Sequence, residues 1–236
     1  MPVLIEIWSD VVCPWCYIGK RRLEAALASF PHRDEVEVVF RSFELDPTAP
    51  QVGTESVADA LARKYGAGPE GTRRMMDRVA AVAADAGLRF DYAHATHSRT
   101  VDAHRLLHLA LAEGGPALQR QVKEAMLSAY FEHGRSMGDH DVLREVAVSA
   151  GLDEATVSRV LAGDEYADAV AADLQQAAAF GITGVPFFVL DRRLAVSGAQ
   201  PVEVFHQALQ QAWEAGHLQL SVLADGSVCG PDGCAV

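Results

Sequence analysis

The stretch VVCPWCYIGK, residues 11–20, holds two of the four cysteines of the chain, Cys13 and Cys16. Thiol–disulfide exchange needs a thiolate that attacks a disulfide and a second thiol that releases the resulting mixed disulfide. Two cysteines at this spacing in the first turn of a helix can supply both, because the backbone N–H groups and the helix dipole stabilise a thiolate there. We therefore expect Cys13 to be an exposed nucleophile at the helix tip, and Cys16 to be a more buried resolving thiol.

The residues around this pair predict a β-α-β unit. Residues 3–8 are β-rich, Pro14 suits the first position of a helix, and residues 35–43 have the composition of a second strand. Such a succession implies parallel strands joined by a right-handed crossover. The apolar positions of the helix are expected to share one face: Trp15, Ile18, Leu23, Ala26, Leu27 and Phe30.

A long block without a convincing strand follows. Start and stop signals predict helices at residues 54–66, 69–86, 100–112, 116–133, 141–150, 153–162 and 166–179. Strands are then expected at residues 185–190 and 194–197, a helix at 201–215, and a candidate strand at 218–223. Without the helical block the order is β-α-β-β-β-α, which predicts a compact α/β layer.

Composition limits the classes of partner. The 236 residues carry a net charge of −12, which argues against nucleic acid or an anionic membrane as the main partner. No apolar run approaches the roughly 18 residues of a transmembrane helix, and the N-terminus lacks the basic region of a signal peptide. We therefore expect a cytoplasmic protein, in which structural disulfides are uncommon.

Zinc is the main alternative ligand for a close cysteine pair. A structural zinc site usually needs four ligands, and the remaining cysteines, Cys229 and Cys234, lie at the far end of the chain. The position of Cys13 and Cys16 at a helix start favours redox chemistry over metal, with a purely structural disulfide as a third alternative. Turn residues between Cys229 and Cys234 make a local disulfide easy to form. An auxiliary redox pair, a structural clip, a metal contact and idle thiols all remain open for them.

Several longer stretches carry a resemblance to a known family: WSDVVCPWCYIGKRRLE, FRSFELDP, THSRTVDAHRL, YFEHGRSMGDHDVL and GITGVPFF. In order and spacing they resemble the FrnE-like branch of the DsbA family of thioredoxin-fold oxidoreductases. The resemblance implies an α/β protein, a thioredoxin fold (β-α-β … β-β-α) interrupted by a large all-helical insertion. The thioredoxin-like domain would comprise residues 1–50 and 181–223, the insertion residues 51–180, and the C-terminal tail residues 224–236.

The resemblance also implies an activity and a site. The protein would be a protein-disulfide oxidoreductase acting on protein or small-molecule disulfides, with Cys13 and Cys16 as its catalytic residues. Pro186 would be a cis-proline facing them, so that the backbone of Val185 can pair with a substrate strand. Family members with a distal second pair support an auxiliary redox role for Cys229 and Cys234. The expected substrate-binding residues are Pro14, Trp15, Thr183, Gly184, Val185 and Pro186.

Cofactors and partners follow from the same chemistry. The dithiol itself carries the electrons, so we expect neither a tightly bound organic cofactor nor a metal, with glutathione as a candidate co-substrate. A thiol system would recycle the pair, and the protein would be a monomer or a homodimer. The best-known DsbA members carry a His inside the CxxC motif, whereas Pro14 and Trp15 stand here, which predicts a less acidic Cys13 and a less oxidising disulfide.

Two other functions are weighed against this one. Glutathione-dependent isomerases and kappa-type glutathione transferases are similar in architecture, but a Ser usually replaces the first cysteine there. The presence of both Cys13 and Cys16 argues against that activity. A redox-responsive binding protein or holdase, whose CxxC responds to oxidant without turnover, is the second alternative.

Several histidines and two acidic residues are further candidates for a functional role. His104 and His108 are four residues apart, with His94 and His97 upstream, but no Glu follows His104, as HExxH would require. We expect packing or surface histidines. Glu6 is either a buried carboxylate that relays protons to the resolving cysteine or an outward side chain on an edge strand. Asp10 is expected to cap the loop before Cys13.

Overall fold

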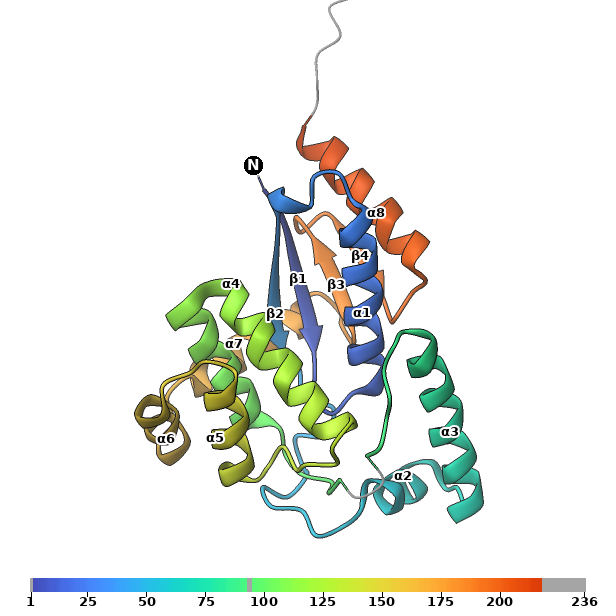
Figure 1. Cartoon of the computed structure of the whole chain (residues 1–236), viewed down its shortest axis with the longest axis vertical. Helices are drawn as coiled ribbons and strands as arrows, with labels where there is room; N and C mark the ends of the chain where they lie inside the picture. The colour runs from blue at the N-terminus through green and yellow to red at the C-terminus, as the bar shows by residue number, and fades with distance from the viewer. Residues whose placement is uncertain (1, 93–94, 218–236) are drawn as a thin grey trace, which may run out of the picture.

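A four-stranded mixed sheet lies at the centre of the structure, a computed structural model that describes residues 2–92 and 95–217 (Figure 1). Its strands have the order β2-β1-β3-β4, and β1 is parallel to β2 while the other pairs are antiparallel. This confirms the predicted α/β layer. The strands are β1 (Val3–Ser9), β2 (Val36–Ser42), β3 (Phe187–Leu190) and β4 (Leu194–Ser197).

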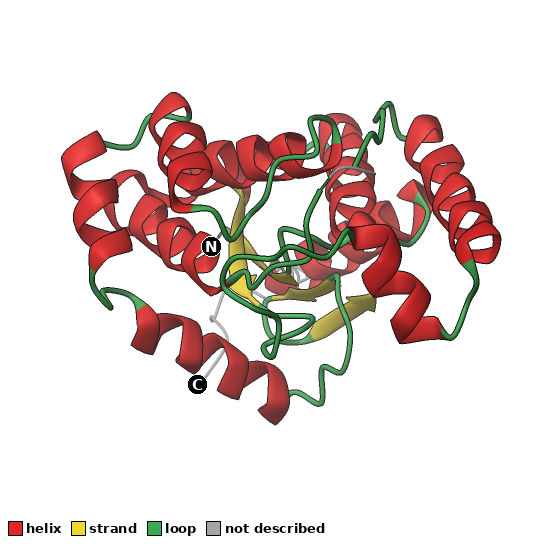
Figure 2. Cartoon of the chain, turned by 90° about the horizontal axis from the view of Figure 1, so that it is seen from below, coloured by secondary structure: helices red, strands yellow, loops and turns green. Residues whose placement is uncertain are grey.

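Helices α1 (Pro14–Ser29) and α8 (Val202–Gly216) pack against each other and cover one face of the sheet. Alternate residues of β1, Ile5 and Ile7, point into this core, as the pleat of a strand requires. The opposite face carries Trp8, whose indole Nε1 donates to the carbonyl of Asp173 at 3.0 Å. Helices therefore lie on both sides of the strands, as Figure 2 shows.

The segment between β2 and β3 is helical, as predicted. Its helices are α2 (Val57–Tyr65), α3 (Pro69–Asp85), α4 (Val101–Phe131), α5 (His140–Ser149), α6 (Glu154–Ala162) and α7 (Ala167–Ala179), and a short 3-10 turn (Arg33–Glu35) precedes β2. These helices enclose a second apolar core, to which α4 contributes Leu106, Leu109 and Met126. This second core, which the insertion shares with residues of α1, thus lies beside that of the sheet, and the domain bounds stay a prediction.

Helix α4 joins two segments that the sequence predicts as separate helices, at residues 100–112 and 116–133. Gly115 adopts φ 65° and ψ −165° inside it, and Pro116 follows. Proline lacks the N–H that would continue the hydrogen-bond ladder, so the helix bends at this point. The predicted interruption is therefore present as a kink inside one long element.

Helix α4 is attached to the sheet at the edge strand β2. The buried Gln119 side chain accepts from the Phe40 N–H at 2.8 Å and donates to the Phe40 carbonyl at 2.9 Å. An edge strand leaves such groups unpaired, and a side-chain amide with one donor and one acceptor can satisfy both. This contact sets the position of α4 against the thioredoxin-like layer.

The prediction that the apolar residues of α1 share one face holds for Leu23, Ala26, Leu27 and Phe30 but not for Ile18 and Trp15. Tyr17 and Ile18 lie in the core of the insertion, whereas Leu23 and Ala26 lie in the core of the sheet. Trp15 belongs to neither, with 40 % of its surface exposed. Helix α1 is packed between two cores, so its buried surface is wider than a single stripe.

The part of the chain after His217 lies outside the described residues. The candidate strand at residues 218–223 and the pair Cys229 and Cys234 therefore remain predictions. Among the helices that the structure does describe, none combines the length and the apolar character needed to cross a bilayer.

Candidate active site

Cys13 and Cys16 lie together at the start of α1. Cys13 is the residue before the first helical position, with φ −94° and ψ 115°, and Pro14 occupies that first position as predicted. The backbone N–H of Cys16 donates to the carbonyl of Cys13 at 3.0 Å, which closes the first turn. Both cysteines are free thiols here. A reduced dithiol at a helix N-terminus is thus in place.

The expectation that Cys13 is exposed is wrong. Cys13 is 3 % exposed and Cys16 is 2 % exposed, so the two thiols are buried to the same degree. The Sγ of Cys13 donates a hydrogen bond to the carbonyl of Val185 across 3.6 Å. The sequence places Val185 172 residues away from Cys13, so this shielding arises only when the chain folds.

The segment before β3 brings together the four residues expected there. The Val185–Pro186 peptide is cis, as the resemblance implies. Together with Thr183 and Gly184 these two residues line an open hollow of about 430 Å³. Pro14 and Trp15, also expected to bind substrate, do not line this hollow but lie in the first turn of α1.

Gly19 allows α1 to lie close to this segment. This role of Gly19 was not predicted from the sequence. A Cβ on Gly19 would lie 3.0 Å from Cγ of Pro186 and 3.1 Å from Cζ of Phe188. Such distances are shorter than ordinary packing contacts, so only glycine fits without displacement of the neighbours. A glycine three residues after the CxxC motif was the available sequence signal.

We expect Gly19→Val to lower the free energy of unfolding by about 1–3 kcal/mol, as overpacking in a core does. Pro186 must move to admit the side chain, so the rate of disulfide reduction should fall as well. Urea unfolding and turnover of a disulfide substrate test both effects. The matched control is Gly71→Ala in α3, where a Cβ meets its nearest neighbour at 3.5 Å and should not destabilise the protein. Unchanged stability and rate in Gly19→Val would show that the segment is not held by this contact.

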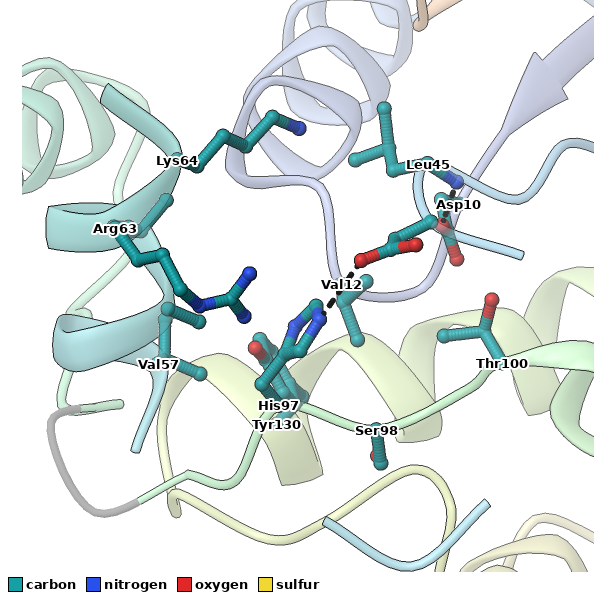
Figure 3. A pocket seen from close by; sticks show the side chains of 13 residues that line it. Asp10, Val12, Leu45, Val57, Arg63, Lys64, His97, Ser98, Thr100 and Tyr130 are labelled. Carbon is teal, nitrogen blue, oxygen red and sulfur yellow. Dashed lines mark hydrogen bonds and ion pairs between the residues drawn. The ribbon is translucent and has the colours of Figure 1, made fainter. Parts of the chain in front are cut away.

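A second hollow, of about 370 Å³, is lined in part by Asp10 and Val12 of the loop that leads to Cys13 (Figure 3). Arg63 and Lys64 reach toward it from α2, and Asp10 lies across from them. The phenol of Tyr130 contributes to the wall although the residue is only 3 % exposed. Val12, which precedes Cys13 in the chain, also lines this hollow. The first hollow includes Val185, whose carbonyl accepts the hydrogen bond from Cys13. Both hollows are therefore adjacent to Cys13.

Asp10 is a buried charge directly before the dithiol. Its Oδ1 accepts from the N–H of Val11 at 2.7 Å and its Oδ2 from the N–H of Leu45 at 2.8 Å, which confirms the expected loop cap. The Oδ1 also lies 3.3 Å from Nε2 of His104. Burial alone would raise the pKa of this carboxyl, but the interactions with His104, with Leu45 N–H and with the ammonium of Lys123 hold the pKa below its ordinary value.

The two thiols differ in acidity. Burial would raise the pKa of Cys16, but the hydrogen bond from Cys13, the charge of Lys123 and the hydroxyl of Ser9 lower it below the ordinary value. The hydrogen bond to Cys16, followed by burial, raises the pKa of Cys13. Because the thiols interact directly, their protons leave in two steps that belong to the pair. The first proton to leave therefore produces a thiolate shared between Cys13 and Cys16.

Glu6 is buried, as the first of the two expectations holds, and the alternative of an outward side chain on an edge strand is wrong. Strand β1 is an inner strand, and Glu6 is 1 % exposed. Its neighbours Ile5 and Ile7 point toward α1, so the carboxylate points to the opposite face. There it binds Arg41 at 2.7 Å and Arg192 at 2.8 Å. Glu6 is a buried ion-pair centre.

The histidines lie where the insertion meets the sheet layer. His104 contacts Asp10, and His108 lies 3.1 Å from Oγ of Ser42, which agrees with the expected packing role. His97 lies 3.0 Å from Asp46, and His94 is outside the described residues. Within residues 2–92 and 95–217, no group of three or more His, Cys, Asp or Glu side chains is placed to hold a metal ion.

Comparison with known proteins agrees with this geometry. Residues 4–210 match the DSBA-like thioredoxin domain family. The chain is similar to the uncharacterized protein YwbO of Bacillus subtilis (strain 168), at 27 % identity over 89 % of this chain and 96 % of that protein. It is also similar to the crystal structure of the probable DsbA oxidoreductase SCO1869 from Streptomyces coelicolor, at 50 % identity, a TM-score of 0.85 and 99 % coverage of both chains.

A more distant similarity extends to the cytosolic disulfide reductase DsbM from Pseudomonas aeruginosa, solved with GSH. Its identity is 18 %, its TM-score is 0.64, and the alignment covers 89 % of this chain and 99 % of that one. This likeness shows a shared fold. The match over most of the sequence, together with a reduced CPWC pair at the start of α1, shows that the chain belongs to the DSBA-like thioredoxin domain family of thiol–disulfide oxidoreductases.

Proposed function

We propose that this protein is a thiol–disulfide oxidoreductase that acts on protein or small-molecule disulfides through Cys13 and Cys16. The observation that supports it most is the pair of free, buried thiols at the helix start, with the Val185 carbonyl accepting from Cys13. The dithiol carries the electrons, so the reaction needs no further organic cofactor. The family membership supports the same reaction class.

In the reducing direction, Cys13 attacks first. Transfer of its proton to Cys16 gives the Cys13 thiolate, which attacks one sulfur of the substrate disulfide and expels the other as a thiolate. The Cys16 thiolate, formed once the proton passes to the leaving thiolate, then attacks Sγ of Cys13. The Cys13–Cys16 disulfide forms, the second substrate thiol leaves, and two electrons have moved to the substrate. The oxidising direction is the reverse of these steps.

Substrate docking is proposed at the segment of Thr183, Gly184, Val185 and Pro186. An extended substrate can pair with exposed backbone there, in the manner of strand addition. The hollow of about 430 Å³ at this segment gives the substrate room. Trp15, which is 40 % exposed, offers an apolar surface beside the thiols.

Small thiols are candidate co-substrates. The hollow of about 370 Å³ beside Val12 could receive a compound such as glutathione, and the distant structural relative DsbM was solved with GSH. Cytoplasmic location also remains a proposal, supported by the expectation from the sequence and by the description of DsbM as cytosolic.

The first test is a redox titration of all four thiols in the full chain, by alkylation and mass spectrometry across glutathione and dithiothreitol buffers. We expect Cys13 and Cys16 to interconvert reversibly between dithiol and disulfide. The double variant Cys229→Ser/Cys234→Ser is run alongside, and a shift of the equilibrium in it would identify a second redox centre in the tail. If Cys13 and Cys16 stay reduced in every buffer, the oxidoreductase proposal fails and the glutathione-binding or holdase alternatives take its place.

A further inference from the structure

Lys123 is a buried cation that takes no part in the proposed exchange steps of Cys13 and Cys16. It lies on α4, in the helical insertion, and has 0 % exposure. Among the described residues no carboxylate oxygen lies within 4 Å of its ammonium. Its ammonium donates to the carbonyl of Ser9 at 3.5 Å, and the ring of Phe40 lies 5.4 Å away. An ammonium held in this way is costly unless a charge in the fold compensates it.

The position of Lys123 is set by the contact of α4 with the sheet edge. Gln119, bonded to both backbone groups of Phe40, comes four residues before Lys123 and so lies on the same helix face. The lysine side chain is thereby directed at the end of β1 and the loop that carries the dithiol. The sequence does not indicate this contact, because Lys123 and Ser9 are 114 residues apart.

The charged and titratable groups that face Lys123 come from three elements. Cys16, Cys13 and Lys20 belong to α1 and the residue before it, Asp10 belongs to the loop after β1, and His104 on α4 itself contacts Asp10. Burial lowers the pKa of Lys123 to about 8, while Cys16, Asp10 and Cys13 act in the opposite direction. The charge of Lys123 in turn favours the thiolate of Cys16.

Lys20 shows what an ordinary buried lysine looks like in this protein. It is 5 % exposed, and its ammonium binds Glu24 at 2.6 Å and Glu124 at 2.5 Å. These two carboxylates, which also bind Arg21, form direct ion pairs with it. Lys123 has no such ion pair among the described residues, and the Cys16 thiol, whose ionisation its charge favours, becomes negative only when the pair is reduced.

We propose that Lys123 is a positioning residue of the redox pair, and that its ammonium is the built-in counter-charge of the Cys16 thiolate. This inference rests on the proposed oxidoreductase function. A disulfide carries no charge, so the ammonium stabilises the reduced pair and not the oxidised pair. Reduction by a dithiol reagent then adds two electrons and one proton to the two sulfurs, leaving one thiol and one thiolate beside Lys123. The helical insertion thereby becomes part of the redox centre.

The lysine content of the chain makes a direct test practical, because Lys20, Lys64 and Lys123 are its only lysines. The full chain labelled with isotopic lysine should give three side-chain NMR signals, assigned through Lys20→Arg and Lys64→Arg by elimination. Binding reciprocity requires that the thiolate favours the ammonium as much as the ammonium favours the thiolate. We expect the acid constant of Lys123 to differ by about tenfold or more between the reduced and oxidised forms. The signals of Lys20 and Lys64 should be the same in both forms.

Removal of the charge provides the second test. In Lys123→Met, the equilibrium with glutathione should move about tenfold or more toward the disulfide, and the thiolate absorbance of the reduced pair should appear at higher pH. Lys123→Arg should restore much of the difference, and the matched control Lys20→Met should change the equilibrium little. The NMR titration uses the unaltered Lys123, so it stands even where the methionine variant does not fold.

The outcomes separate this inference from the function beneath it. If Cys13 and Cys16 cycle normally but the Lys123 signal titrates identically in both redox states, the counter-charge role is wrong and the oxidoreductase function stands. The same conclusion follows if Lys123→Met folds and its glutathione equilibrium equals that of the wild type. If the pair does not cycle at all in the wild-type protein, both the proposed function and this inference fall.

Discussion

Cys13→Ser is expected to abolish the reduction of disulfide substrates. The Cys16→Ser protein is expected to form the mixed disulfide with its substrate but not to resolve it. Serine at position 13 offers no thiolate, so no mixed disulfide can form. Serine at position 16 leaves the attacking thiol but removes the group that resolves the intermediate. The Cys16→Ser protein should therefore accumulate as a mixed disulfide with its substrate. Turnover assays and mass spectrometry under non-reducing conditions measure these two results.

The control for both variants is Cys229→Ser/Cys234→Ser, which keeps Cys13 and Cys16 and should retain turnover. Partial activity in Cys13→Ser would instead favour a glutathione-dependent isomerase, whose chemistry does not require a redox cysteine. Protection of client proteins from aggregation with both N-terminal cysteines replaced would favour a holdase. Each result thus supports a different function for this protein.

Asp10→Ala is expected to produce a large loss of stability, about 3–5 kcal/mol in the free energy of unfolding, as removal of one partner from a buried charge group does. The carboxylate has 0 % exposure and accepts from the backbone N–H groups of Val11 and Leu45. Alanine leaves both donors buried without an acceptor and removes one of the negative charges that favour the Lys123 ammonium. Asp10→Asn, which keeps an acceptor, should lose less. Urea unfolding near neutral pH measures the difference.

The pH dependence of this effect follows from the lowered pKa of Asp10 in the folded protein. A carboxyl with a folded pKa below its unfolded value of about 3.9 contributes stability that is fully present above that unfolded value. The contribution is lost as the pH falls through the folded pKa. The stability gap between wild type and Asp10→Asn should therefore narrow in acid.

An exposed aspartate provides the matched control for Asp10. The side chain of Asp34 is 96 % exposed, and Asp34→Ala should leave the unfolding free energy nearly unchanged. A loss below about 1 kcal/mol in Asp10→Ala would mean that water or a rearranged loop replaces the carboxylate, and that the buried charge group is less tightly coupled than its hydrogen bonds indicate.

Local patterns were sufficient to predict the elements that carry the dithiol. Proline can begin a helix at Pro14 because the first helical N–H has no intrahelical partner, and the short apolar run rich in strand-forming residues at β1 indicates a strand. The succession of helices between β2 and β3 is likewise encoded by nearby residues, through caps and apolar periodicity. The kink of α4 at Gly115 and Pro116 was also visible as a break in the helical pattern.

The environment of the dithiol could not be predicted in the same way. The shielding of Cys13 by Val185 and the burial of Lys123 against the Ser9 carbonyl depend on contacts across more than 100 residues. Nothing in the residues around Glu6 indicates that Arg41 and Arg192 enclose it. A lysine is usually exposed, so a single sequence gives no reason to place Lys123 in the core.

The sequence by itself therefore determined the reacting groups, their spacing and the helix start that holds them, because these depend on short-range backbone geometry. Only the tertiary structure decided how deeply the thiols are buried and which charges surround them. The acidity of a thiol depends on desolvation and on charges within several ångströms. In this protein those charges are Asp10, from the loop before the dithiol, and Lys123, from α4. That helix begins more than 80 residues after Cys16 in the sequence.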